Sequence, residues 1–186
     1  MAPIIRSLSE TDAAAFRTIR LAALELAPEA FGTVLENEAK RPLAHFAALL
    51  RETAVFVAEH AGAPVAVARL TPGRAPKEAH KAVINGFFVR PEYRGSGVAG
   101  ALMAALIEAA RGRYEQLVLE VVAENAGAVR LYRRFGFQEF GREPRARKSG
   151  GGYQDLAMMW LPLDSRGGGA APRAGLPDAR REGGTA

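Results

Sequence analysis

The chain has 186 residues, of which 48% are hydrophobic, and a formal net charge of +5. This is enough for one filled core, and the basic excess is too small to indicate nucleic acid by itself. No cysteine is present, so disulfides, thiolate metal sites and a cysteine nucleophile are excluded. No apolar run reaches the roughly 18 residues of a membrane-spanning helix, and a signal-peptide pattern is absent, so we expect a cytoplasmic protein.

The chain alternates strand and helix patterns in the way of a layered α/β domain. The expected elements are a strand at 4–8, a helix from a Ser9/Asp12 capping box to Pro28, a helix at 42–51, a hairpin of strands 54–58 and 64–70, a strand at 82–89, a helix at 98–110, a strand at 117–122, a helix at 126–135 and closing strands at 138–141 and 154–161. Residues 145–152 are polar and glycine-rich, which predicts a mobile turn between the closing strands.

Composition divides the chain near residue 163. Residues 1–163 are expected to form the α/β domain. Residues 164–186 are rich in Gly, Pro, Ala and Arg with almost no large apolar side chain. Such a segment cannot bury enough surface to offset the entropy of ordering it, so we expect a disordered tail.

A glycine-rich loop joins the strand at 82–89 to the apolar helix at 98–110. It reads Arg94-Gly95-Ser96-Gly97-Val98-Ala99-Gly100. Glycines let the backbone approach a ligand closely, and the first turn of a helix offers free amides and a partial positive charge. The loop therefore suits a phosphate or pyrophosphate, although a tight turn that merely connects strand to helix fits the same residues.

The same loop also has the glycine spacing of a dinucleotide-binding motif. Glycines stand at 95, 97 and 100, and Glu120 follows at the distance of a ribose-binding acid. Against this, residues 90–94 separate the strand from the first glycine, and more than half of the ordered chain precedes the motif. Too few strands follow to complete a doubly wound sheet, so a nicotinamide-dependent oxidoreductase stays only as an alternative.

Further motifs follow one another in a fixed order along the chain. They are Pro28 and Phe31, the Val-x-Pro lead-in at 89–91, Leu119-Glu120-Val121, Asn125, Ala128, Leu131-Tyr132, Gly136-Phe137 and, in the last strand, Tyr153, Asp155, Met158 and Leu161. Together with Arg94, Gly97 and Ala99, which match the signature Gln/Arg-x-x-Gly-x-Gly/Ala, this set resembles the GNAT superfamily of N-acetyltransferases. The resemblance covers roughly residues 3–163.

The resemblance implies the acyl-CoA N-acyltransferase (GNAT) fold, with about seven strands and four helices. Two central parallel strands, ending at Val89 and Val122, are expected to splay apart and expose backbone groups that need another partner. It also implies acetyl-CoA as co-substrate. The implied contacts are the backbone of Phe87, Phe88 and Val89 for the pantetheine arm, and the amides of Arg94, Gly95, Ser96, Gly97, Val98, Ala99 and Gly100 for the pyrophosphate. For the Arg94 side chain, two roles stay open: contact with a phosphate, or solvation.

Two residues of the helix at 126–135 acquire roles from the resemblance. Asn125 is placed to cap the helix, and the resemblance adds a contact with the cofactor arm. Tyr132 is the expected general acid, because a phenol with a pKa of about 10 stays protonated at neutral pH and can protonate a leaving thiolate. The alternative for Tyr132 is a core position beside Phe135 and Phe137.

The general base is open. A free amine is protonated at neutral pH and must lose that proton before it attacks. Many members of the superfamily carry a glutamate on the strand before the loop, where this chain has Val83-Ile84-Asn85-Gly86-Phe87. Asn85 holding a water is one candidate. Glu120 is the other, and strand alternation points it away from its neighbours Leu119 and Val121, where a solvated face or an ion pair is the competing role.

The remaining polar residues give weaker signals. No metal is expected, because His45, His60 and His80 have no metal-ligand spacing. A basic cluster suits an acidic acceptor, the adenosine 3′-phosphate or plain solvation, and comprises Arg142, Arg145, Arg147 and Lys148. Three arginines flank Tyr132 and are candidates for a phosphate contact, namely Arg130, Arg133 and Arg134.

These observations predict an N-acetyltransferase that moves an acetyl group from acetyl-CoA to a primary amine of a small molecule or peptide by direct attack. A backbone N–H near Val89 is expected to stabilise the oxyanion. The acceptor is expected to enter opposite acetyl-CoA, beside the helices of residues 11–51 and the hairpin near His60. A non-catalytic acyl-CoA-binding sensor, favoured by the missing strand glutamate, is the alternative. No nucleic-acid or membrane partner is expected, and a homodimer is an open alternative to a monomer.

Overall fold

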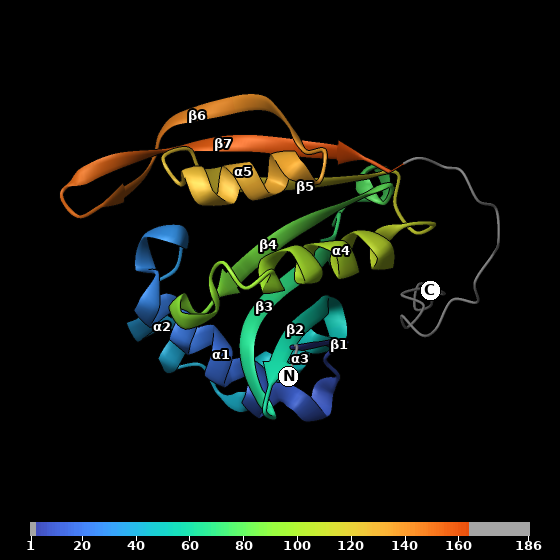
Figure 1. Cartoon of the computed structure of the whole chain (residues 1–186), viewed down its shortest axis with the longest axis vertical. Coiled ribbons are helices and arrows are strands. Elements are labelled where there is room, and N and C mark those ends of the chain that lie inside the picture. Colours follow the sequence, from blue (N-terminus) through green and yellow to red (C-terminus); the bar gives the residue numbers. More distant parts are fainter. Residues whose placement is uncertain (1–2, 164–186) are drawn as a thin grey trace, which may run out of the picture.

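The computed structural model describes residues 3–163, which build a seven-stranded mixed sheet and five α-helices (Figure 1). The strands are β1 (Ile4–Ser7), β2 (Ala54–His60), β3 (Ala63–Pro72), β4 (Lys81–Val89), β5 (Gln116–Val122), β6 (Gln138–Ser149) and β7 (Gly152–Pro162). The helices are α1 (Ala13–Leu26), α2 (Leu35–Ala39), α3 (Leu43–Glu52), α4 (Val98–Ala110) and α5 (Ala126–Arg134).

The order of the strands places one parallel pair at the centre of the sheet. The order is β1-β2-β3-β4-β5-β7-β6. Strands β4 and β5 are parallel, and every other neighbouring pair in the described sheet is antiparallel. The parallel pair is connected through α4, as a parallel crossover requires. The sequence-based prediction of a mixed sheet with central parallel strands is confirmed.

Two apolar clusters cover the two faces of the sheet. One joins α1 and α3 to the sheet through Phe16, Phe46, Val57, Val67 and Phe88. The other joins α4 and α5 to the opposite face and includes Leu102, Met103, Leu119, Tyr132 and Met159. Figure 1 shows α4 crossing β3 and β4, and α5 lying against the β5–β7 part of the sheet. Each strand residue therefore faces either the α1 side or the α4 side, according to strand alternation.

Local sequence explains where the main helices begin. The Asp12 carboxylate accepts a hydrogen bond from the Ser9 backbone N–H at 2.8 Å, as the predicted capping box requires. Helix α4 is almost entirely apolar, and its buried residues include Leu102, Met103 and Leu106. The helix predicted at 98–110 is confirmed, and the one predicted from the capping box to Pro28 is found as a 3-10 turn at Glu10–Asp12, which the box caps, followed by α1 at 13–26. None of the helices described between residues 3 and 163 is long and apolar enough to cross a membrane.

Two expectations about secondary structure were wrong. Helix α2 adds a fifth helix to the four expected. It has five residues and none of them is buried, so its sequence has no apolar periodicity from which a helix could be predicted. Residues 145–152 are mostly strand rather than a mobile turn. Strand β6 continues to Ser149, where it pairs with Gly152 of β7, and only Gly150 and Gly151 form the turn. The predicted tail, 164–186, lies outside the described residues.

Candidate active site

The central parallel strands separate halfway along their length. Strands β4 and β5 pair from Lys81↔Gln116 to Ile84↔Leu119 and no further. Beyond that point, β4 continues through Asn85 to Val89 and β5 through Glu120 to Val122, without pairing to each other. The backbone groups on these facing edges have no sheet partner, so a ligand that donates and accepts hydrogen bonds can take their place. This geometry is the predicted splay.

The loop before α4 presents free amides beside that opening. Gly97 is the N-cap of α4 and has φ 88°, which a side chain would strain. The first amide to bond within the helix is that of Ala101, which donates to the Gly97 carbonyl. The amides of Val98, Ala99 and Gly100 therefore remain available at the positive end of the helix, as an anionic ligand requires.

Not every amide of the loop is available for the pyrophosphate contacts expected from Arg94 to Gly100. The Arg94 amide donates to the Pro91 carbonyl at 3.1 Å, and the Ser96 amide lies 3.4 Å from the Tyr93 carbonyl. The Arg94 side chain also turns back, with its Nε 3.4 Å from the Val89 carbonyl oxygen. Arg94 is exposed and uses only its Nε in this contact, so both roles left open for its side chain stay predictions.

Tyr132 lies on α5 and reaches the splayed part of β4. Its ring packs edge-on against Phe87 at 6.1 Å between centroids, and against Phe137 at 6.0 Å. The residue is 6% exposed, and burial raises the pKa of its phenol above the usual value. Tyr132 is thus a neutral hydrogen-bond donor that also packs in the core, so the two interpretations of this residue are compatible.

The Tyr132 hydroxyl is not sealed inside the protein. Among the described residues, Gln154 Oε1 is the only fully buried side-chain nitrogen or oxygen without a hydrogen-bond partner. The Tyr132 hydroxyl is not among those sealed atoms, and no described side chain or backbone group bonds to it, so it is free to donate to a ligand. A proton donor in this place can meet a group bound in the splay.

Asn125 caps α5 as predicted. Its Oδ1 accepts a hydrogen bond from the Ala128 amide at 3.1 Å. The cap fixes the start of α5 directly after the end of β5, and so sets where Tyr132 meets the opening. The expected contact of Asn125 with the cofactor arm stays a prediction.

A row of polar side chains crosses the sheet at the base of the splay. Arg69 of β3 is the register partner of Asn85 on β4, which comes directly after the last β4–β5 pair. Glu120 follows Leu119 at the same level on β5. Their apolar neighbours Leu70, Ile84 and Leu119 pack on the α4 side, so Arg69, Asn85 and Glu120 face the α1 side.

The two candidate bases differ in their environments. Asn85 Oδ1 accepts from Arg69 Nε at 2.6 Å, and Asn85 Nδ2 donates to Thr71 Oγ1 at 3.1 Å. Each polar end of Asn85 therefore makes one bond to the protein and keeps capacity for one more, so the predicted role of Asn85 in holding a water stays a prediction. Glu120 is exposed, as the competing role on a solvated face requires, and no described cation pairs with it, so the competing ion-pair role finds no partner. Of the two, only Glu120 carries a carboxylate that can itself take a proton.

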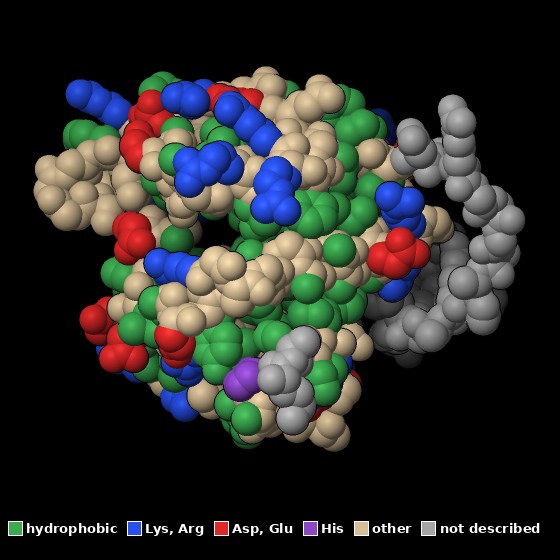
Figure 2. All heavy atoms as spheres, in the orientation of Figure 1, with side chains coloured by type: hydrophobic (Ala, Val, Ile, Leu, Met, Phe, Trp, Pro, Cys, Tyr) green, Lys and Arg blue, Asp and Glu red, His purple; other side chains and the backbone are tan. Residues whose placement is uncertain are grey.

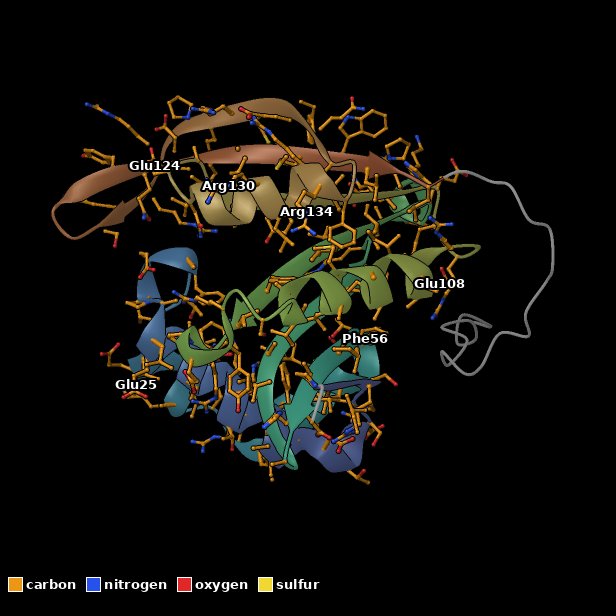
Figure 3. The ribbon with its side chains drawn as sticks, in the orientation of Figure 1. Glu25, Phe56, Glu108, Glu124, Arg130 and Arg134 are labelled. Carbon is orange, nitrogen blue, oxygen red and sulfur yellow. The ribbon has the colours of Figure 1, made fainter. Side chains whose placement is uncertain are left out.

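Cations of α5 line a hollow in the surface. Figure 2 shows the molecule hollowed between α5 and the loop before α4, with Lys or Arg side chains along the upper edge. Figure 3 shows Arg130 and Arg134 on the side of α5 that faces this region. Both residues are exposed, whereas Arg133 is held 3.5 Å from Glu139. Of the three arginines, Arg130 and Arg134 are the ones free to meet phosphates.

Other predicted residues lie elsewhere or are already engaged. The ring of His60 lies 5.5 Å from that of Tyr93, so the hairpin near His60 borders the loop before α4, and its expected place on the acceptor side stays a prediction. In the basic cluster, Arg142 bonds Glu139 and Arg147 bonds the Ala30 carbonyl. Within residues 3–163, no group of three or more His, Asp or Glu side chains is arranged to hold a metal ion.

An opened central strand pair, with a glycine-capped helix beside the opening, defines the acyl-CoA N-acyltransferase class of fold. The chain belongs to the acetyltransferase (GNAT) family, whose family model matches residues 20–137. The solved structure of yncA from Salmonella typhimurium, with its cofactor acetyl-CoA, is similar, with a TM-score of 0.71 and 26% identity over 94% of this chain and 99% of that one.

Two curated relatives carry related names. The L-methionine sulfoximine/L-methionine sulfone acetyltransferase of Pseudomonas aeruginosa is 36% identical over 83 residues, which are 44% of this chain and 48% of that protein. The protein of the same name from Salmonella typhimurium is 30% identical over 122 residues, 64% of this chain and 69% of that one. The match to the first of these spans about half of its length.

Proposed function

We propose that the protein transfers the acetyl group of acetyl-CoA to a primary amine of a small molecule or peptide, by direct attack of the amine on the thioester. The observation that carries this proposal is the end of β4–β5 pairing at Ile84↔Leu119 beside a helix start with free amides. One part of the opening suits an amide-bearing arm and the other suits a pyrophosphate. The similar structure solved with acetyl-CoA supports that choice of co-substrate.

Binding is assigned to backbone groups. The edge of β4 from Phe87 to Val89 would bond the pantetheine arm, and the amides of Gly97 to Gly100 would bond the pyrophosphate. Arg130 and Arg134 are placed to neutralise phosphates above the hollow. Asn125 is kept as a further contact with the arm, because it lies at the end of β5.

The chemical step needs one proton acceptor and one donor. The amine nitrogen gives its proton to Glu120 and attacks the carbonyl carbon, while a backbone N–H near Val89 stabilises the oxyanion. As the carbon–sulfur bond breaks, the thiolate takes the proton of the Tyr132 hydroxyl. A cysteinyl acyl-enzyme has no part, because the chain contains no cysteine.

Glu120 removes the main argument for a non-catalytic sensor, which rested on the missing glutamate of β4. A carboxylate at the same level of the neighbouring strand can also accept the proton of the amine. The names of the two curated relatives support an acetyl acceptor with an amine among small molecules of the amino-acid type.

The proposal is tested by two calorimetric titrations, followed by an enzymatic assay. Calorimetry with acetyl-CoA and, separately, with NADH should give binding for acetyl-CoA alone. Thiol release from acetyl-CoA should then depend on added primary amine. Binding of NADH without acetyl-CoA would favour the oxidoreductase alternative, whereas acetyl-CoA binding without amine-dependent release would favour the sensor.

A further inference from the structure

Arg69 is a half-buried cation that lacks an anionic partner. Its Nε donates to Asn85 Oδ1 at 2.6 Å, which is a neutral acceptor. Among residues 3–163, no carboxylate is in ion-pair contact with Arg69, and none of its terminal nitrogens belongs to the buried atoms that lack a partner. The Nη1 and Nη2 groups therefore point where solvent or a ligand can reach them.

The surroundings of Arg69 add positive charge rather than remove it. Arg20 of α1 lies near and is itself paired with Glu38 of α2 at 3.2 Å, with side chains only 17% and 12% exposed. Glu38 attracts Arg69 as well, but it is bound to Arg20, and Arg74 adds a further positive charge nearby. Burial, followed by the charge of Arg20, lowers the pKa of Arg69, which nevertheless stays charged because arginine cannot be deprotonated in proteins. One positive charge in this place is uncompensated.

Half-burial removes part of the hydration of the Arg69 guanidinium, and the carboxylate of a ligand would compensate that loss. Asn85 orients the guanidinium through its bond to Nε, and Thr71 in turn accepts a hydrogen bond from Asn85 and so holds the amide in place. A fixed guanidinium with free Nη groups is suited to bind a carboxylate through two parallel hydrogen bonds.

We propose that Arg69 binds a carboxylate of the amine acceptor, so that the acceptor is an amino acid or another amine with a carboxylate close to its nitrogen. The inference rests on the proposed function and names its substrate class. Arg69 acts here as a specificity-determining residue.

The position of Glu120 agrees with such an acceptor. Arg69 and Glu120 lie at the same level of the sheet and on the same face, with β4 between them. Arg69 is one strand spacing from Asn85, and Glu120 lies across the opening that begins at this level, so the two backbones are more than about 10 Å apart. Both side chains face the same side of the sheet, so an acceptor whose carboxylate is on Arg69 would have its α-amino group on the side of the opening where Glu120 lies.

Each L-amino acid of a panel is compared with its own carboxamide in a thiol-release assay. The proteins are the wild type, Arg69→Gln, Arg69→Lys and Arg111→Gln, the last removing an exposed arginine at the far end of α4. For Arg69→Gln, we expect KM for the amino acid to rise about tenfold or more, with KM for the carboxamide and for acetyl-CoA changed less than about twofold. Arg69→Lys should lie between, and Arg111→Gln should match the wild type.

The proposal would be overturned if Arg69→Gln raised KM equally for the amino acid and for its carboxamide. It would also be overturned if the wild type acetylated carboxamides only. Calorimetry of the same ligands in the presence of CoA gives an independent readout. If thiol release fails with every amine while Arg69→Gln still abolishes binding of amino acids alone, the acetyltransferase function fails and the carboxylate site stands. If neither ligand class binds, the carboxylate site fails too. Melting temperatures check that each variant folds.

Discussion

Ile84 of β4 and Leu119 of β5 are the last residues to pair across the centre of the sheet. The residues directly beyond them, Asn85 and Glu120, face the α1 side from the two edges of the opening. One of these is held by Arg69 and Thr71, and the other is exposed. The same break in pairing therefore creates a place for an extended ligand and sets a carboxylate beside it.

Replacing Glu120 by Gln should lower kcat/KM for the amine by about 100-fold or more, because the acceptor loses its proton acceptor. Raising the pH should recover part of the rate, since the amine then deprotonates without help. Affinity for acetyl-CoA should not change. Glu108→Gln is the control, since Glu108 lies near the far end of α4 and is 80% exposed (Figure 3). An equal rate in Glu120→Gln and wild type would exclude Glu120 as the base.

Replacing Tyr132 by Phe should lower kcat by about 100-fold and leave the Kd for acetyl-CoA unchanged, because only the proton donor to the thiolate is lost. The hydroxyl has no hydrogen-bond partner in the described residues, so the free energy of unfolding should change by less than about 0.5 kcal/mol. Stopped-flow thiol release and urea denaturation measure the two effects. A full rate in the variant would leave Tyr132 with a packing role alone.

Replacing Gly97 by Ala should weaken acetyl-CoA binding by about tenfold or more. With φ 88°, the position strains any side chain by about 1 kcal/mol, and relief of that strain would turn the first amides of α4. Gly112→Ala is the matched control, because Gly112 has φ 70° and likewise nothing within 4 Å of an added Cβ, at the other end of α4. Similar affinity losses in both variants would point to general destabilisation.

Replacing Asp12 by Ala should cost about 1 kcal/mol of stability at neutral pH, through the loss of the capping box at Ser9. Hydrogen bonds from Arg6, and then from the Ser9 amide, lower the pKa of Asp12 to about 2 in the folded protein. A depressed carboxylate pKa stabilises the fold above the unfolded value of about 4, and this contribution is lost as the pH falls toward 2. Urea denaturation at neutral pH and near pH 2 should show that the difference in free energy of unfolding between the wild type and Asp12→Ala is smaller in acid. An equal difference at the two pH values would contradict the lowered pKa of Asp12.

Local signals in the sequence were sufficient for much of the fold. The capping box at Ser9, the apolar helix at 98–110 and the cap at Asn125 each depend on residues close together in the chain, and each is confirmed. The splay followed from the family resemblance, because the end of pairing at Ile84↔Leu119 depends on contacts between distant segments.

The parts that were missed depend on tertiary contacts. Helix α2 buries no side chain, so its sequence has no periodicity to detect. The polar residues after Arg145 form strand because they pair with β7, where Tyr153 also packs under the guanidinium of Arg145 at 4.8 Å. The hydrogen bond of Asn85 with Arg69 was also missed, because it joins residues of two neighbouring strands that are far apart in the sequence.

The central claim is acetyl transfer to an amine, and its most direct test is thiol release from acetyl-CoA across a panel of primary amines, with the products weighed by mass spectrometry. We predict amine-dependent release matched by an equal amount of amine that is heavier by one acetyl group. Release that is the same without amine, or a panel on which no amine is acetylated by a protein that still binds acetyl-CoA, would contradict the account.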